Sequence, residues 1–471
     1  MVNRSLHRLL LPGLSTALLL AVFWGQSAHA QDPAGTLLTL PEALDYADAH
    51  YPSVRAALAQ KVAADRDVDV ARAAYLPQVN LLYQINRATL NNITGVLLPQ
   101  SVIPSMSGPV LPRSGDSAWN SGAGALVSWR PFDFGYRAAK VDAAQAADAV
   151  AAQAAMLSEL DVLSATSDAY INLAAAQSLA TTAEANQARL HAFAGAVHAL
   201  VDNTLRPGVD AQQADAADGL AQTALISARA NVENQKAVLA ALVDRPFQAI
   251  AIDARALQAV PPEAAGGPAP SLSGHPAAQA AAARVRQQSA EATAAGSQYA
   301  PQLDVVGSAY SRGSGKTPSG AYTGGDTGLT PSVSNWAVGL QVTVPLGSFP
   351  ALRAQQAGQK ARLQAEQARY DQTLDDLKTR LAQARTNLDS ARAITKVTPV
   401  VLEAARQGEA QQRARFQSGL ATVVDVTAAE AALAQAESQD AIARLNVWRA
   451  LASLAAAEGD MTPFRKRLSP Q

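Results

Sequence analysis

Apolar residues in the C-terminal third recur at alternating spacings of three and four positions, which is the pattern of a coiled-coil seam. The seam residues are Leu363, Tyr370, Leu374, Leu377, Leu381, Ala384, Leu388, Ala391, Leu402 and Ala405. Gly419 stands where the pattern ends, so the pattern predicts one helix of about 65 residues that closes at this glycine. An alanine-rich run from Leu420 to Glu458 predicts the returning arm of a long helical hairpin. Charged residues recur along the hairpin, so neither arm is a membrane span.

Four other segments alternate apolar and polar residues with a period of two, as strands with one apolar face do. They lie at residues 78–86, 118–130, 303–309 and 336–344. Aromatic residues near the strand ends, where a membrane interface would place them, are Tyr83, Trp119, Trp129 and Trp336. A length of about ten residues suits a strand of an outer-membrane barrel. Half of a soluble β-sandwich is the alternative interpretation.

The chain contains an internal repeat. Pro52 and the run Tyr75-Leu76-Pro77 recur, at the same spacing, as Pro276 and the run Tyr299-Ala300-Pro301. Each copy reads as helix, strand, loop, strand, long helix, turn and helix, so the sequence predicts a duplicated unit.

Prolines, glycines and changes of period divide the chain into nine expected parts. These are a signal peptide (1–30), an N-terminal segment with short helices (31–77), a first β-hairpin with an outer loop (78–130), a first long helical hairpin (131–245), a connector (246–273), a second-repeat helix (274–300), a second β-hairpin with an outer loop (301–345), a second long helical hairpin (346–458) and a C-terminal tail (459–471). In the second part, Thr39 followed by Glu42 predicts a capping box for the first short helix.

The N-terminus has the pattern of a cleavable secretory signal. Arg4 and Arg8 precede an apolar run from Leu9 to Trp24, and the segment ends in Ala28-His29-Ala30. An anchor helix is the alternative. The chain contains no cysteine, which excludes disulfides, cysteine zinc sites and a lipid-modified N-terminal cysteine.

Composition argues against other classes of function. A net charge of −1 gives no excess of positive charge with which to bind nucleic acid. The run from Gly313 to Thr317 resembles the end of a phosphate loop, but Tyr310 stands where that motif requires glycine. His191 and His198 could share a helix face, yet no carboxylate lies between them. We therefore expect no enzyme activity, no cofactor and no metal site.

Four strands are too few to close a membrane barrel, and an open sheet edge in lipid leaves backbone groups unpaired. Three copies would supply twelve strands and bring six long helical hairpins together. The predicted fold is therefore mainly α with a membrane β-barrel portion: a homotrimer in outer-membrane lipid, with a barrel of long hairpins beside a shared twelve-stranded β-barrel.

Several short motifs, in this order, resemble those of the TolC-like outer membrane efflux proteins. They are Leu40-Pro41-Glu42-Ala43-Leu44, Tyr75-Leu76-Pro77, Phe132-Asp133-Phe134-Gly135, Phe416-Gln417-Ser418-Gly419 and Val424-Asp425-Val426. The resemblance covers nearly the whole mature chain. It implies a trimeric outer-membrane channel with a long periplasmic extension, which docks on a periplasmic adaptor and an inner-membrane transporter. A type I protein secretion outlet of the same fold and a surface structural or adhesive coiled-coil protein are the alternatives.

The resemblance also implies functional residues. The adaptor-docking turns would be Arg206-Pro207-Gly208 and Ser418-Gly419-Leu420. Asp425 matches the first of two aspartates that ring the closed periplasmic entrance in the family, whereas Ala428 occupies the second position. A second carboxylate would have to come from Glu430 or Asp215. Asp425 has a simpler role as well, because a negative charge early in a helix stabilises the helix dipole.

Overall fold

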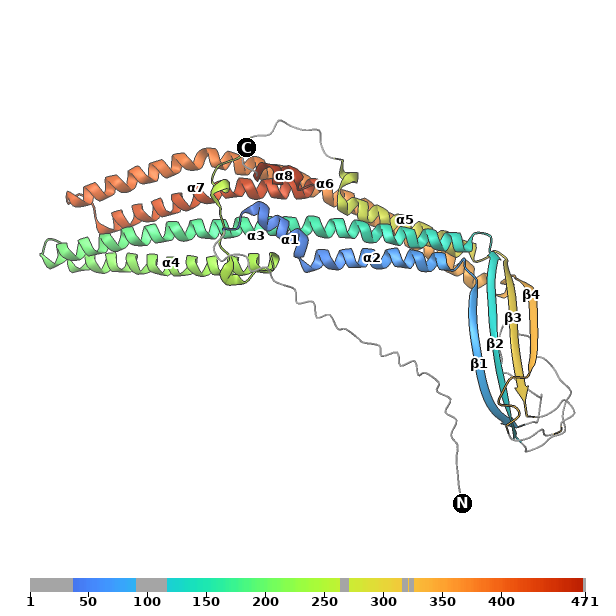
Figure 1. Cartoon of the computed structure of the whole chain (residues 1–471). Coiled ribbons are helices and arrows are strands. Elements are labelled where there is room, and N and C mark those ends of the chain that lie inside the picture. The colour runs from blue at the N-terminus through green and yellow to red at the C-terminus, as the bar shows by residue number, and fades with distance from the viewer. Residues whose placement is uncertain (1–36, 90–116, 263–270, 316–320, 322–325, 469–471) are drawn as a thin grey trace, which may run out of the picture. The chain divides into compact units, whose positions relative to one another are not determined.

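The computed structural model describes residues 37–89, 117–262, 271–315, 321 and 326–468. These residues belong to one unit, Leu37–Gln471, and consist of long helices and one four-stranded sheet (Figure 1). The helices are α1 (Leu40–His50), α2 (Pro52–Ala73), α3 (Tyr136–Asp202), α4 (Gly208–Leu242), α5 (Pro276–Ser297), α6 (Phe349–Gln417), α7 (Val423–Glu458) and α8 (Thr462–Leu468). The strands are β1 (Gln78–Thr89), β2 (Ser117–Phe132), β3 (Gln302–Ser314) and β4 (Val333–Thr343). Short 3₁₀ helices occur at Phe247–Ala249, Arg255–Leu257, Leu272–Gly274 and Leu346–Ser348. The prediction of a mainly helical chain with four strands is confirmed.

The predicted repeat is present in the structure. Helix α2 begins at Pro52 and α5 at Pro276, and both have 22 residues. Strands β1 and β3 follow them at the same interval. The capping box of α1 is also as predicted, because the Thr39 hydroxyl accepts the Glu42 N–H and the Glu42 carboxylate accepts the Thr39 N–H at 2.8 Å.

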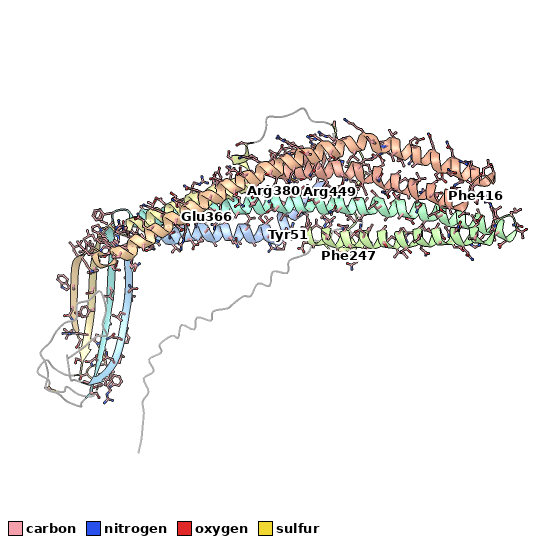
Figure 2. All side chains as sticks on the ribbon, turned by 180° about the vertical axis from the view of Figure 1, so that it is seen from behind. Tyr51, Phe247, Glu366, Arg380, Phe416 and Arg449 are labelled. Carbon is pink, nitrogen blue, oxygen red and sulfur yellow. The ribbon has the colours of Figure 1, made fainter. Side chains whose placement is uncertain are left out.

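The helices pack side by side in a fixed lateral order. Near the sheet, neighbouring helices follow the order α2, α3, α5 and α6, and at the other end the order is α4, α3, α7 and α6 (Figure 1). Helix α3 is therefore internal throughout, whereas α6 forms one lateral edge of the chain and α2 and α4 form the other. Figure 2 shows Phe416 close to the hairpin ends, far from the strands.

The main core lies where α1, α3, the connector and α7 meet. The hydroxyl of the fully buried Tyr170 lies 2.8 Å from the carbonyl oxygens of both Leu38 and Asp253 and shares its one proton between them. The Trp448 indole donates to the Ala259 carbonyl at 3.0 Å. These bonds fasten the connector, which has little regular structure of its own, to the long helices.

The predicted seam of α6 is buried in its middle part, at Leu377, Leu381, Ala384, Leu388 and Ala391. The seam residues nearer the two helix ends are half-buried within one chain. The seam of this edge helix is therefore only partly covered within one chain.

The sheet has antiparallel order β1-β2-β3-β4 with both edges unpaired among the described residues. Register aligns the apolar residues of all four strands on one face. One row contains Val79, Val127, Gly307 and Val338, and the next contains Leu81, Ala125, Ala309 and Trp336. Leu81 is 84% exposed and Trp336 79% exposed, so this apolar face has no covering within one chain.

Some predicted boundaries differ from the structure. Strand β3 continues to Ser314, because it stays paired with β2 beyond the alternating segment. Helix α7 begins at Val423 rather than at Leu420, because Thr422 caps it. The signal peptide (1–30), most of the first outer loop and the end of the run Gly313 to Thr317 lie outside the described residues.

Candidate functional site

The two hairpin turns, residues 203–207 and 418–422, lie together and are joined by Arg206. Its guanidinium lies 4.6 Å from the centre of the Phe416 ring, and it donates to the carbonyls of Phe416 and Ala421, both at 3.4 Å. Asp210 pairs with the same guanidinium at 3.7 Å. Arg206 therefore connects the first turn to the second, and its side chain is only 20% exposed.

The glycines of the two turns are not equivalent. Gly419 has φ +76°, a left-handed conformation that terminates α6, as the sequence predicts. Gly208 instead begins α4, and the left-handed residue of the first turn is Thr204, with φ +61°. Gly208 therefore does not cap α3, because the chain leaves that helix at Thr204, four residues earlier.

Four exposed apolar side chains lie in or directly after the two turns. They are Leu205, Val209, Leu420 and Val424, with exposed fractions of 69%, 54%, 70% and 53%. Only Leu420 was identified from the sequence. Exposed apolar residues clustered at one end of a molecule are typical of a protein interaction site. We call these four residues the tip patch.

Asp425 occupies the first turn of α7 as part of a capping box. Its carboxylate accepts the Thr422 N–H and the Thr422 hydroxyl, both at 2.8 Å. Hydrogen bonding from the Thr422 backbone and hydroxyl lowers the pKa of Asp425, so the side chain is ionised. The helix-end role is thus present in the structure, and the charge is on an exposed side chain.

Glu430 does not face an entrance, because its side chain is fully buried. It accepts from Arg189 of α3 at 2.8 Å and from Arg413 of α6. Arg189 also pairs with Glu437 at 3.1 Å, and Arg413 with Glu409 at 2.6 Å. We call these five residues the charge cluster; it joins α3, α6 and α7, and Glu430 is its fully buried member. The sequence held a signal for it, since Glu430 occupies a seam position between Val426 and Leu433.

The two histidines of α3 each face an aspartate of α4. His198 lies 2.7 Å from Asp215, and His191 lies 2.8 Å from Asp218. The hydrogen bond that the His198 ring donates to the Asp215 carboxylate raises the pKa of His198. Asp215, the other proposed source of a second gate carboxylate, is thus engaged by a partner within its own hairpin. No group of three or more metal-ligating side chains occurs in the described part of the chain.

The four aromatics predicted at the membrane interface all lie on the apolar face of the sheet by register. Trp129 lies at the helical end of β2, where its indole donates to the Tyr75 carbonyl at 3.0 Å. Trp119 lies toward the loop end, with the Arg87 guanidinium 5.7 Å from its ring centre. Tyr83 and Trp336 lie between them and are 62% and 79% exposed.

A buried ion pair holds the junction between strand and helix. Asp133 and Arg137 form it at 2.6 Å, and Arg137 donates further to the carbonyls of Ala74 and Pro131. The guanidinium lies 4.4 Å from the centre of the Tyr75 ring. Tyr75 and the run from Phe132 to Gly135 thus meet at one junction, which Arg137 holds together.

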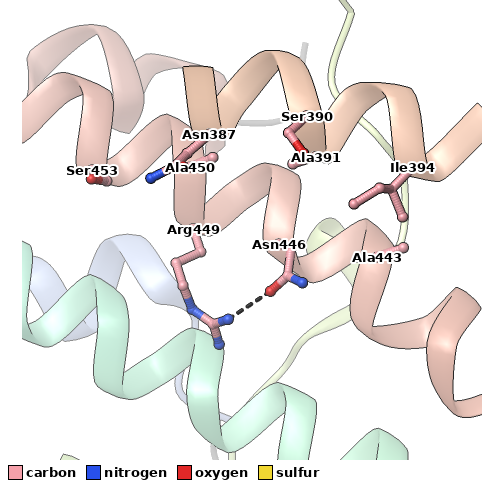
Figure 3. A pocket seen from close by; sticks show the side chains of 9 residues that line it. All are labelled: Asn387, Ser390, Ala391, Ile394, Ala443, Asn446, Arg449, Ala450 and Ser453. Carbon is pink, nitrogen blue, oxygen red and sulfur yellow. Dashed lines mark hydrogen bonds between the residues drawn. The ribbon is translucent and has the colours of Figure 1, made fainter. Parts of the chain in front are cut away.

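A cavity of about 330 Å³ lies between α6 and α7, where Arg449 extends toward α3 (Figure 3). Its guanidinium donates to Asn446 and Asn172, both at 2.6 Å. The charge of Arg449 is therefore bound by two asparagines, and the side chains that line this cavity do not converge as catalytic groups do.

No helix in the described part of the chain combines the length and apolar character of a membrane span.

Comparison with known proteins agrees with this arrangement. Residues 43–244 and 268–460 match the family described as outer membrane efflux protein. The chain is 29% identical to Protein CyaE of Bordetella pertussis over 462 residues, which cover 92% of this chain and 88% of that protein.

Solved structures share the fold. The outer membrane protein VceC of Vibrio cholerae superposes with a TM-score of 0.72 at 21% identity, covering 89% of this chain and 96% of VceC. The open state of the MtrE outer membrane channel of Neisseria gonorrhoeae gives 0.68 at 19% identity, covering 89% of each chain. The chain belongs to the outer membrane efflux protein family, and it is an export channel of the outer membrane with long periplasmic helices.

Proposed function

We propose that three copies of the chain form one continuous export conduit, which docks on a periplasmic adaptor and an inner-membrane transporter. The observation that carries this proposal is the four-stranded sheet with two unpaired edges and one uncovered apolar face. Lipid covers the apolar face, but it offers no partner to the backbone N–H and C=O groups of the two edge strands. Strand β1 of one copy must therefore pair with β4 of the next.

The helices support the same order of assembly. The edge that contains β1 also contains α2 and α4, and the edge that contains β4 continues into α6. Both edges expose apolar side chains, which on α6 lie in one short stretch of the helix. On one edge these are Leu58, Val62, Val70, Leu220, Ile226 and Val238, and on the other Ile394, Val397, Val400 and Val401. The contact is head-to-tail, and three such contacts close a ring.

The spacing of two tryptophans along β2 agrees with the thickness of the apolar part of a membrane. Trp119 and Trp129 lie on one face of β2, about 33 Å apart along the strand at ~3.3 Å per residue. A strand tilted by about 40° would reduce this to a height of about 25 Å, the height of the apolar band of an outer-membrane barrel. We therefore assign Trp119 and Trp129 to the two interfaces.

Purified in detergent, the protein should have three times the mass of the mature chain. Unpaired sheet edges and exposed apolar helix edges both disfavour the isolated chain. Light scattering corrected for bound detergent measures this mass. A stable monomer that inserts into lipid would contradict the shared barrel.

The tip patch should bind the adaptor. Replacing Leu420 with aspartate places a charge on a side chain that is 70% exposed, so we expect export and adaptor binding to fall at least about tenfold because a desolvated charge opposes the contact. Trimer yield and melting temperature should stay close to those of the unmodified protein, since Leu420 makes little contact within its own chain. A matching loss of trimer would instead assign Leu420 a structural role.

Identifying the transporter that co-purifies with the channel distinguishes efflux of small molecules from type I protein secretion. The transporter decides between them because it selects the cargo.

A further inference from the structure

The face of the sheet opposite the apolar one is polar and mostly uncharged. Register places on it Gln78, Asn80, Gln84, Asn120, Ser128, Ser308, Asn335 and Gln341. If the sheet closes as proposed above, this face lines the lumen of the membrane barrel.

Charged residues on this face of the described strands are Arg130, Asp304 and Arg312. Arg130 and Asp304 neutralise each other through two hydrogen bonds, at 2.7 and 3.3 Å, near the helical end of the sheet. Arg312 lies toward the opposite end of β3, close to the loop, and is half-buried. The face thus carries an unbalanced positive charge at its loop end.

The strand neighbours of Arg312 do not neutralise its charge. In register, Arg312 lies opposite Gly122 of β2 and Val333 of β4. Neither residue has a polar side chain that could pair with a guanidinium. A guanidinium without a carboxylate opposite it attracts anions.

We propose that Arg312 forms an anion-attracting ring in the lumen near the loop end of the barrel. The ring contains one arginine from each copy and therefore rests on the proposed trimer. Small anions, and anionic groups on the exported cargo, are favoured there. The probe for this site is chloride, because its passage is measured directly.

The test is the ratio of chloride to potassium permeability, obtained from the reversal potential of the purified protein in a planar bilayer under a KCl gradient. Replacing Arg312 with glutamine should lower this ratio about twofold or more, since three unit charges act at about 10 Å across water. Arg312→Lys keeps the charge and should retain the ratio. Arg87→Gln is the matched control, because Arg87 lies on the same sheet but on the apolar face.

An unchanged ratio in Arg312→Gln would overturn the proposal, provided that the variant is trimeric with a normal melting temperature. An equal fall in Arg87→Gln would also overturn it, since the effect would not depend on the lumen face. Failure of the unmodified protein to form channels would instead overturn the barrel itself, and the ring with it.

Discussion

Replacing Arg189 with methionine should destabilise the protein by about 3–5 kcal/mol, because it leaves a fully buried carboxylate with one of its two guanidinium partners. Glu430 is 0% exposed, so water cannot replace the lost bond. Helix α3 would then lose its charged contact with α7, while the apolar contacts around it remain. The measurement is the melting temperature of the trimer in detergent.

Arg229→Met is the matched control for this change. Arg229 pairs with Glu184 at 3.0 Å across the first hairpin, but the two side chains are 61% and 63% exposed. An exposed pair contributes less than about 1 kcal/mol. Equal effects of the two substitutions would show that burial of Glu430 does not determine the stability of the cluster.

The pH dependence of the melting temperature provides a second test of the role of Glu430. Burial raises the pKa of Glu430 above its ordinary value of 4.5, and the neighbouring Glu409 raises it further. A carboxyl whose pKa is raised in the folded state binds its proton more tightly there than when unfolded, so its contribution to stability increases as pH falls through the raised pKa. Arg189→Met removes a charge that lowers this pKa. Its melting temperature should therefore approach that of the unmodified protein as pH falls toward about 4.5.

Local patterns predicted the elements well because the residues that define them are close in the sequence. The capping box of α1 requires only Thr39 and Glu42, and the end of α6 requires only the backbone freedom of Gly419. Alternation likewise places the apolar residues of each strand on one face, and pairing then aligns the faces.

Contacts between the two repeats could not be predicted in the same way. Arg206 binds carbonyls of the second turn, and Arg189 binds Glu430, although each pair is more than 200 residues apart in sequence. A periodic pattern specifies which face of a helix is buried, but not which helix covers it. The resemblance to the family places Arg206 in an adaptor-docking turn, but only the structure shows that its side chain is largely enclosed between the two turns.

A test of the Asp425 charge has to preserve the helix cap that this residue forms. Alanine at this position would remove the charge and, with it, the acceptor of the Thr422 N–H and hydroxyl. Loss of a helix cap costs about 0.5–2 kcal/mol, so a changed current could reflect a frayed α7 instead of a missing charge. Asparagine keeps an oxygen acceptor at the same place and removes only the charge.

Asp425→Asn should therefore weaken block of the channel by divalent cations if Asp425 lines the closed entrance. Three carboxylates converging on one axis attract a divalent ion far more than three amides do, and we expect the blocking concentration to rise about tenfold. Single-channel conductance with added Mg²⁺ measures this concentration, and the melting temperature should stay unchanged because the cap is retained. Thr422→Ala is the complementary variant: it removes the cap hydroxyl and keeps the charge, so it should lower the melting temperature while block persists. Unaltered block in Asp425→Asn would leave Asp425 as a helix-end charge alone.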